Sequence, residues 1–339
     1  LGIKRAAVYP KATEHIPHII ELIEALVSKG VAYVVDGDVF FDVSKFPEYG
    51  RLSNQDIKAL SAGARVDVDE RKRNPMDFAL WKRAKPGEPK WDSPWSEGRP
   101  GWHIECSAMS MTYLGETFDI HTGGQDLIFP HHENEIAQSE AATGKPFVKY
   151  WIHNGYINID GEKMSKSLGN FFTLREIVEK YPPDVVRLFL ISSHYRSPIN
   201  FSDEELNKAE RSLERLRNSV RAINGILEKG EVIGEVDEGE LNGIDLNFYN
   251  KVAEARERFI SGMDDDFNTA IGVSVLHDLA KEVNIFMNSS EFQINPTKLS
   301  LLKNAMDAFM DFGEVLGISL KESDSATLDG KEEELIELL

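Results

Sequence analysis

The chain contains a single cysteine, Cys106, among 339 residues. One cysteine cannot form an intramolecular disulfide, which excludes a disulfide-stapled secreted fold and leads us to expect a cytoplasmic protein. No hydrophobic run approaches the ~18 residues that span a bilayer, so no membrane association is expected. Basic residues are also scarce: 38 stand against 57 acidic residues, and the net charge of -19 argues against a basic nucleic-acid coat.

The excess of acidic residues is uneven. Residues 229–245 and 321–339 each carry a net charge of -5, which is typical of solvated connectors. In the rest of the chain the acidic and basic residues are closer to equal in number, so the sequence is compatible with a local RNA-binding surface. Hydrophobic residues make up 41% of the chain, as in ordinary globular proteins, and the length accommodates two or three domains.

Hydrophobic spacing predicts a small α+β unit over residues 12–98. A helix capped by Thr13 is expected to run to Gly30, because apolar residues recur with helical period between them. The sequence Asp36-Gly37-Asp38 between two apolar runs predicts a β-hairpin turn.

Residues 99–147 predict a strand, a glycine loop and a helix. The strand is expected over residues 118–121, the loop contains Gly123 and Gly124, and the helix begins at Pro130. A strand that leads through glycines into a helix indicates a phosphate or nucleotide site at the carboxyl end of the strand. From Ser202 onward the spacing is helical almost throughout, which predicts a helical bundle with helices around residues 248–262, 268–289 and 298–315.

Three residues have the chemistry of a metal site. His131 and Glu135 are four residues apart, so they share one face of the predicted helix, and His132 is expected to point elsewhere. With the thiol of Cys106 they offer three ligand types that zinc accepts, as in catalytic zinc sites. The residues alone leave the alternatives open: a solvated helix start, and a cysteine that acts as a small buried hydrophobe.

Residues 161–170 combine glycines at both ends with Lys163, Lys166 and two serines. Ammonium and hydroxyl groups on such a loop suit a polyphosphate whose charge rises in a transition state. A solvated turn is the competing interpretation.

These motifs together resemble a known family. Residues 163–167, Lys-Met-Ser-Lys-Ser, match the KMSKS signature of class I aminoacyl-tRNA synthetases letter for letter. Further segments resemble cysteinyl-tRNA synthetases specifically, and the resemblance extends from about residue 12 to at least residue 316; the segments are residues 74–78, 98–106, 123–135, 169–172 and 194–197.

The resemblance implies an α/β fold: the C-terminal half of a class I Rossmann-type nucleotide fold with an α+β insertion, followed by an all-α bundle. The implied domains are a remnant of the first half, the insertion, the second half with the zinc ligands, the KMSKS connector and a truncated anticodon-side bundle, at residues 1–11, 12–98, 99–147, 148–201 and 202–339.

The resemblance also implies the chemistry. Cysteine would be activated by ATP with Mg²⁺ and then transferred to tRNA(Cys), with one Zn²⁺ selecting the substrate thiol and a monomer as the expected state. The implied site residues are Cys106, His131 and Glu135 for zinc, Trp102, His121 and Asp126 for the amino acid, and Lys163, Lys166, Gly123, Gly124 and Asp126 for ATP.

Two family features are absent from the sequence. The ATP signature His-Ile-Gly-His does not occur, and residues 15–18, His-Ile-Pro-His, are expected in the first turn of a helix instead. The family's fourth zinc ligand, a cysteine near the N-terminus, is also missing. We therefore expect an internal fragment of such a synthetase.

Three other functions compete with this interpretation. A synthetase-like ligase could join cysteine to an amino sugar, although it has less need of the helical bundle. A catalytically inactive tRNA-binding paralogue is the second alternative. The third is a zinc hydrolase with Glu133 as its general base, which leaves the lysine loop unexplained.

Overall fold

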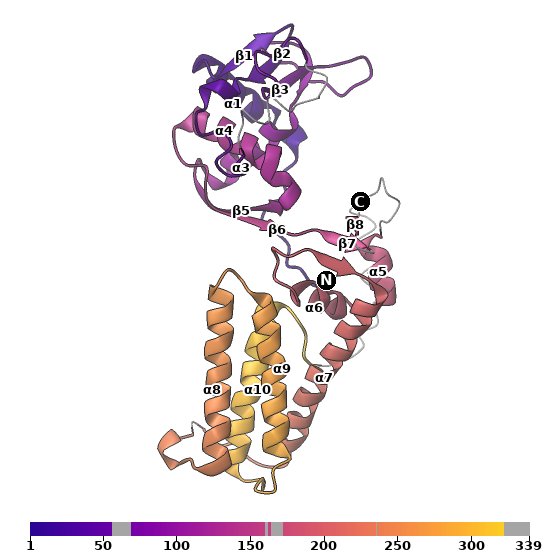
Figure 1. The fold of residues 1–339 in the computed structure, drawn as a ribbon, viewed down its shortest axis with the longest axis vertical. Coiled ribbons are helices and arrows are strands. Elements are labelled where there is room, and N and C mark those ends of the chain that lie inside the picture. Colours follow the sequence, from indigo (N-terminus) through magenta and orange to yellow (C-terminus); the bar gives the residue numbers. More distant parts are fainter. Residues whose placement is uncertain (56–68, 160–161, 164–171, 235, 322–339) are drawn as a thin grey trace. The chain divides into compact units, whose positions relative to one another are not determined.

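A computed structural model describes residues 1–55, 69–159, 162–163, 172–234 and 236–321 (Figure 1). The chain forms two compact units, Arg5–Asn154 and Leu1–Lys4 with Gly155–Leu339. None of the helices described has the length and hydropathy of a membrane span. The five predicted domain ranges stay a prediction.

The unit Arg5–Asn154 begins with helix α1 packed against a four-stranded antiparallel sheet. The predicted hairpin is confirmed: Asp36 and Gly37 have φ of 54° and 88°, the two left-handed positions that a tight hairpin turn requires. The elements are α1 (Ile16–Ser28), β1 (Ala32–Val35), β2 (Asp38–Phe41), η2 (Val43–Lys45), β3 (Phe78–Arg83) and β4 (Gly98–Pro100).

Helix α1 begins later than predicted. A short 3-10 turn, η1 (Ala12–Glu14), precedes the helix, so Thr13 does not cap it and His15 occupies the cap position. Pro17 stands in the first turn, where its missing N–H costs nothing. Residues 15–18 therefore lie at a helix start, as predicted, and His15 Nε2 lies 3.0 Å from the hydroxyl of Tyr113.

The buried carboxylate of Asp77 explains the Asn74–Phe78 motif. It accepts hydrogen bonds from the hydroxyl of Tyr33 at 2.6 Å, the amide of Val43 at 3.0 Å and the amide of Asn74 at 3.0 Å. One carboxylate thus joins β1, η2 and the turn that precedes β3. These hydrogen bonds stabilise the sheet, and this structural role explains the motif.

The second part of this unit is a strand–helix–strand arrangement. Strand β5 (Phe118–Gly124) pairs in parallel with β6 (Val148–Asn154), and helix α4 (Glu133–Thr143) connects them in the sequence. The predicted loop glycines Gly123 and Gly124 belong to β5, because they continue its pairing with β6. The prediction that the helix begins at Pro130 was also wrong: short turns, η3 (Gln125–Leu127) and η4 (Ile128–His132), come first.

Helix α3 (Trp102–Leu114) packs against α1 and α4. Gln138 of α4 fastens this packing, since its amide nitrogen donates to the His103 carbonyl and to the Ser107 hydroxyl, both at 2.7 Å.

The other unit contains a small sheet and the predicted helical bundle. The sheet has the order β8–β7–β9 and lies near α5 and α6 in Figure 1. The elements are β7 (Ile157–Ile159), β8 (Glu162–Lys163), α5 (Leu174–Lys180), α6 (Pro183–Ile191), β9 (Ile199–Phe201), α7 (Asp203–Leu227), η6 (Glu238–Glu240), α8 (Gly243–Asp264), α9 (Thr269–Met287) and α10 (Pro296–Leu316).

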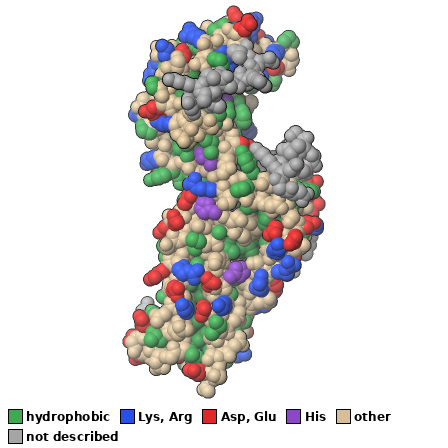
Figure 2. Space-filling view, viewed as in Figure 1, with side chains coloured by type: hydrophobic (Ala, Val, Ile, Leu, Met, Phe, Trp, Pro, Cys, Tyr) green, Lys and Arg blue, Asp and Glu red, His purple; other side chains and the backbone are tan. Residues whose placement is uncertain are grey.

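The bundle is built on apolar stripes, as its sequence predicts. Ser202 caps α7 by accepting a hydrogen bond from the amide of Glu205. Aromatic rings stack across the helices, with Phe259 and Phe312 centred 4.1 Å apart. On the bundle face visible in Figure 2, acidic and basic side chains are interspersed.

Gly155 and Gly225 give opposite predictions for the same unit. A Cβ on Gly155 would lie 2.5 Å from the backbone carbonyl of Ser197, so Gly155→Ala should lower the free energy of unfolding by about 1–3 kcal/mol. Gly225 is exposed within α7 and has open space around it, so Gly225→Ala should raise it by about 0.5–1 kcal/mol. Urea unfolding measures the free energy of unfolding of both variants. Equal changes would contradict the close contact of Gly155 with Ser197 and the open space around Gly225.

Candidate functional site

The start of helix α4 is polar in sequence yet buried in the structure. Glu133, Glu135 and Gln138 are 0% exposed, although such residues are rarely buried without partners. A buried polar group costs free energy unless it is hydrogen-bonded, so the partners of each side chain indicate its role.

Glu133 has a structural set of partners. Its carboxylate accepts hydrogen bonds from the Ser53 amide at 2.9 Å and from the Ser53 hydroxyl at 2.8 Å. The neighbouring Asn134 accepts one from the Tyr49 hydroxyl at 2.5 Å. A carboxylate engaged in this way fastens residues 49–53 to α4 and is poorly placed to act as a general base.

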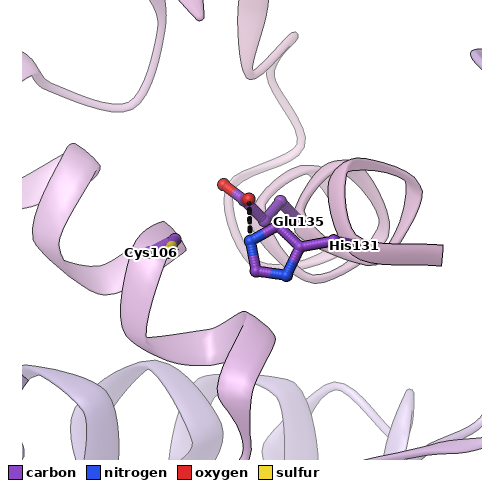
Figure 3. Close-up of side chains that lie close together, drawn as sticks. All are labelled: Cys106, His131 and Glu135. Atoms are coloured by element: carbon purple, nitrogen blue, oxygen red, sulfur yellow. Dashed lines mark ion pairs between the residues drawn. The ribbon is translucent and has the colours of Figure 1, made fainter. Parts of the chain in front are cut away.

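The hydrogen-bond partners of Glu135 differ from those of Glu133. Both of its oxygens are buried, and neither accepts a hydrogen bond of ordinary geometry from the described residues. His131 Nε2 lies 2.9 Å from Oε1, and the ligand atoms of Cys106, His131 and Glu135 all lie within 4.8 Å of one another. Figure 3 shows Cys106 on a neighbouring helix and the His131–Glu135 pair. Sequence spacing predicted that His131 and Glu135 share a face, and the family resemblance implied that Cys106 joins them.

The Cys106 thiol and the His103 imidazole are held uncharged at neutral pH. Burial, with Glu135 and Glu105 close by, raises the pKa of the Cys106 thiol to about 12. Burial and the neighbouring His131 lower the pKa of His103 to about 4. The Nδ1 atoms of His103 and His131 lie 2.8 Å apart, so this contact orients the His131 ring with Nε2 toward Glu135.

A second group of possible ligands shares Glu135. His121, His132 and Glu135 bring their ligand atoms within 4.8 Å of one another, and His121 Nε2 is 3.7 Å from Glu135 Oε2. His132 Nδ1 also lies 2.8 Å from His153 Nε2. The expectation that His132 points away from the site was therefore wrong. Burial lowers the pKa of His132 to about 3 and that of His121 as well, so both rings are neutral.

The remaining predicted residues surround this cluster or lie beyond it. The Trp102 ring is 64% exposed, with its centroid 4.7 Å from that of His131. A Cβ on Gly123 would lie 2.6 Å from His132 Cε1, so glycine permits this close approach. Asp126 lies exposed in η3.

Lys163 is the last residue of β8, and its backbone pairs with that of Asn158 in β7. Both strands belong to the unit that contains residues 155–339. Lys166 lies outside the described residues.

Sequence reasoning missed His103, His153 and Gln138. Each lies far in sequence from the residue it contacts, and a single polar residue carries little local signal of such a contact. Only its unusual burial distinguishes it.

Comparison with known proteins shows which family the chain resembles. Residues 1–211 match the class I (C) tRNA synthetase catalytic domain, and residues 258–321 match the DALR domain. A cysteine–tRNA ligase of Pelobacter propionicus is 52% identical over 350 residues, which cover 100% of this chain and 71% of that protein. The chain belongs to the cysteine–tRNA ligase family.

Other relatives agree with this assignment. The cysteine–tRNA ligase of Pelotomaculum thermopropionicum is 54% identical over 318 residues, which cover 94% of this chain and 64% of the relative. That of Heliobacterium modesticaldum is 52% identical and is covered to 70%. The chain thus spans about two thirds of the length of these cysteine–tRNA ligases.

Solved structures support the fold. The Mycobacterium tuberculosis methionyl-tRNA synthetase bound by methionyl-adenylate matches with a TM-score of 0.66 at 15% identity, over 91% of this chain and 74% of that one. A Campylobacter jejuni arginyl-tRNA synthetase matches with a TM-score of 0.65 at 14% identity, over 94% of this chain and 64% of that one. The predicted class I Rossmann-type fold with a helical C-terminal region is confirmed.

The partners of Glu133 yield a stability prediction. Ser53→Ala removes a hydroxyl that donates to a buried carboxylate, so the free energy of unfolding should fall by about 1–3 kcal/mol. Ser28→Ala, which removes an exposed hydroxyl bonded within α1, should change it by less than about 0.5 kcal/mol. Denaturant unfolding compares the two variants, and equal effects would contradict a structural role for Glu133.

Proposed function

We propose that this chain carries the cysteine-activating part of a cysteine–tRNA ligase, with Cys106, His131 and Glu135 as ligands of one Zn²⁺. The observation that carries the proposal is the buried Glu135 carboxylate, which accepts no hydrogen bond of ordinary geometry from the described residues and faces a thiol and an imidazole nitrogen. A buried carboxylate is costly without a proton or a cation. The donor set of sulfur, nitrogen and oxygen fits zinc.

When bound, zinc supplies a Lewis acid that favours thiolate over hydroxyl ligands and so distinguishes cysteine from serine. The chain's own residues would prepare this selection. His103 orients the His131 ring through the Nδ1 contact, a typical supporting interaction for a metal ligand. Trp102 and His121 would line the amino-acid pocket.

The lysine loop would act on ATP. In the proposed first step the cysteine carboxylate attacks the α-phosphate and pyrophosphate leaves. Lys166, assisted by Lys163, would stabilise the charge that develops on the leaving phosphates, with Mg²⁺ as counter-ion. Gly123 and Gly124 allow close backbone approach to the nucleotide, and Asp126 would face the substrate amine or ribose.

In the proposed second step the terminal ribose hydroxyl of tRNA(Cys) takes the cysteinyl group and AMP leaves. Helices α7–α10 would provide the tRNA-binding surface, and this surface favours tRNA over an amino sugar as the acceptor.

Charging assays with tRNA(Cys) and with an amino sugar distinguish the two acceptors. An inactive paralogue would bind tRNA without activating cysteine, and peptidase activity lost on chelation would support the hydrolase.

Removal of the thiol tests the zinc assignment. Cys106→Ala should reduce zinc from about one ion per chain to a small fraction, and cysteine-dependent ATP–pyrophosphate exchange should fall with it. Elemental analysis after purification without chelators measures the metal. Ser110→Ala, on the same helix α3, should retain both properties. Zinc and exchange that both persist in Cys106→Ala would refute the assignment.

Substitution of the second lysine tests the loop separately. Lys166→Ala should lower the rate of cysteinyl-adenylate formation by about 100-fold, the typical loss when one stabilising donor is removed, and zinc content should stay unchanged. Lys145→Ala, which removes a lysine paired with Glu116, should leave the rate near that of the unmodified chain. Zinc loss in Lys166→Ala would contradict the assigned role.

A further inference from the structure

Two motifs from the sequence meet at one carboxylate. Asp266, in the connection between α8 and α9, accepts hydrogen bonds from the Tyr195 hydroxyl at 2.6 Å and from Arg196 Nε at 2.5 Å and a second Arg196 nitrogen at 3.1 Å. His194 Nε2 lies 3.7 Å away. Arg196 thus grips both carboxylate oxygens, a geometry that adds strength and direction to an ion pair.

The α8–α9 connection presents Asp266 from a fixed position. Asp266 and Phe267 both have left-handed backbone, with φ of 59° and 53°. Such a conformation in a bulky residue persists only where the surrounding structure imposes it. Here the Asn268 amide donates to the Gly262 carbonyl at 3.1 Å, and Gly262 allows the side chain of Ile271 to pack against it.

The residues that grip Asp266 belong to the turn before β9. The Gly155 amide, next to β7, donates to the Tyr195 carbonyl at 2.7 Å. A Cβ at Gly155 would meet the backbone of Ser197, so this turn and the start of β7 are in direct contact. The turn is thereby fixed to strands β7 and β9, which pair in parallel.

The same sheet begins the lysine loop. Strand β7 pairs with β8 on its other side, with Asn158 opposite Lys163. Lys163 is the first residue of the KMSKS motif. The structure therefore contains a continuous series of backbone and side-chain contacts, from the α8–α9 connection through residues 194–197 to the strand that leads into the lysine loop.

We propose that Asp266 is a positioning residue for adenylate formation: through Tyr195 and Arg196 it holds the β7–β9 sheet in place relative to α8 and α9, and the KMSKS motif begins at Lys163, the last residue of β8 in this sheet. Asp266 touches no substrate in this role. The inference rests on the proposed function for its catalytic consequence, while the contacts themselves can be tested independently of activity.

Asp266→Asn is the variant of choice, because asparagine tolerates the left-handed backbone while the charge and one of the two acceptor oxygens are lost. Hydrogen exchange, followed by mass spectrometry of the full chain, should become about tenfold faster over residues 155–159 and 199–201. Asp278→Asn is the matched control. It also breaks a carboxylate–arginine pair, with Arg258 at 3.0 Å, but within α8 and α9 alone, so exchange in the sheet should not change.

A second measurement distinguishes positioning from simple loss of stability. In ATP–pyrophosphate exchange, Asp266→Asn should raise KM for ATP about fivefold or more and leave KM for cysteine unchanged, because only the loop's contribution to ATP binding is altered. A partly unfolded population would lower the apparent kcat and leave both KM values in place. Tyr195→Phe should produce a smaller change in the same direction.

The outcomes are distinct. Faster exchange in the sheet together with a selective rise in KM for ATP supports the proposal. Equal exchange in the Asp266 and Asp278 variants, or an unchanged KM for ATP, overturns it. If the unmodified chain does not activate cysteine, the proposed function fails, and the exchange comparison alone decides whether Asp266 positions the sheet.

Discussion

The buried carboxylate of Glu135 is the strongest chemical constraint in the unit Arg5–Asn154. Its oxygens are withdrawn from water and accept no hydrogen bond of ordinary geometry from the described residues, although His131 Nε2 lies 2.9 Å from Oε1. A buried charge without compensation costs several kcal/mol, so a carboxylate in this position is stabilised by a positively charged partner. The contacts of α4 with Ser53 and with α3 keep this helix in place despite that cost, and so keep the carboxylate directed toward Cys106 and His131.

The polar residues of α4 therefore divide into two groups by their partners rather than by their type. Glu133 and Gln138 are bonded to neighbouring backbone and hydroxyl groups and stabilise the packing. Glu135 instead faces possible metal ligands: the Cys106 thiol and the imidazoles of His131, His121 and His132. Burial, together with the negative charge of Glu135, raises the pKa of the Cys106 thiol, whereas a divalent cation beside a thiol would favour the thiolate.

The unit that carries the lysine motif is organised differently. Its helices are held together by apolar side chains, whereas its small sheet meets the α8–α9 connection through the polar contacts of Asp266. Apolar packing is non-directional, but a carboxylate gripped by an arginine fork specifies orientation. Directional contacts of this kind are suited to fixing the orientation of a short sheet.

Sequence alone was sufficient for the family, the hairpin at Asp36-Gly37, the helices of the bundle and the convergence of Cys106, His131 and Glu135. These features follow from local periodicity, turn chemistry and unbroken motifs. Tertiary structure decided what local rules misjudged. Gly123 and Gly124 are strand residues because β6 pairs with them in parallel. Thr13 does not cap α1, because a short 3-10 turn precedes that helix. His132 belongs to the cluster because His121 of β5 and His153 of β6 lie close to it. Partners that are distant in the sequence carry no local signal, because only packing brings them within hydrogen-bond distance.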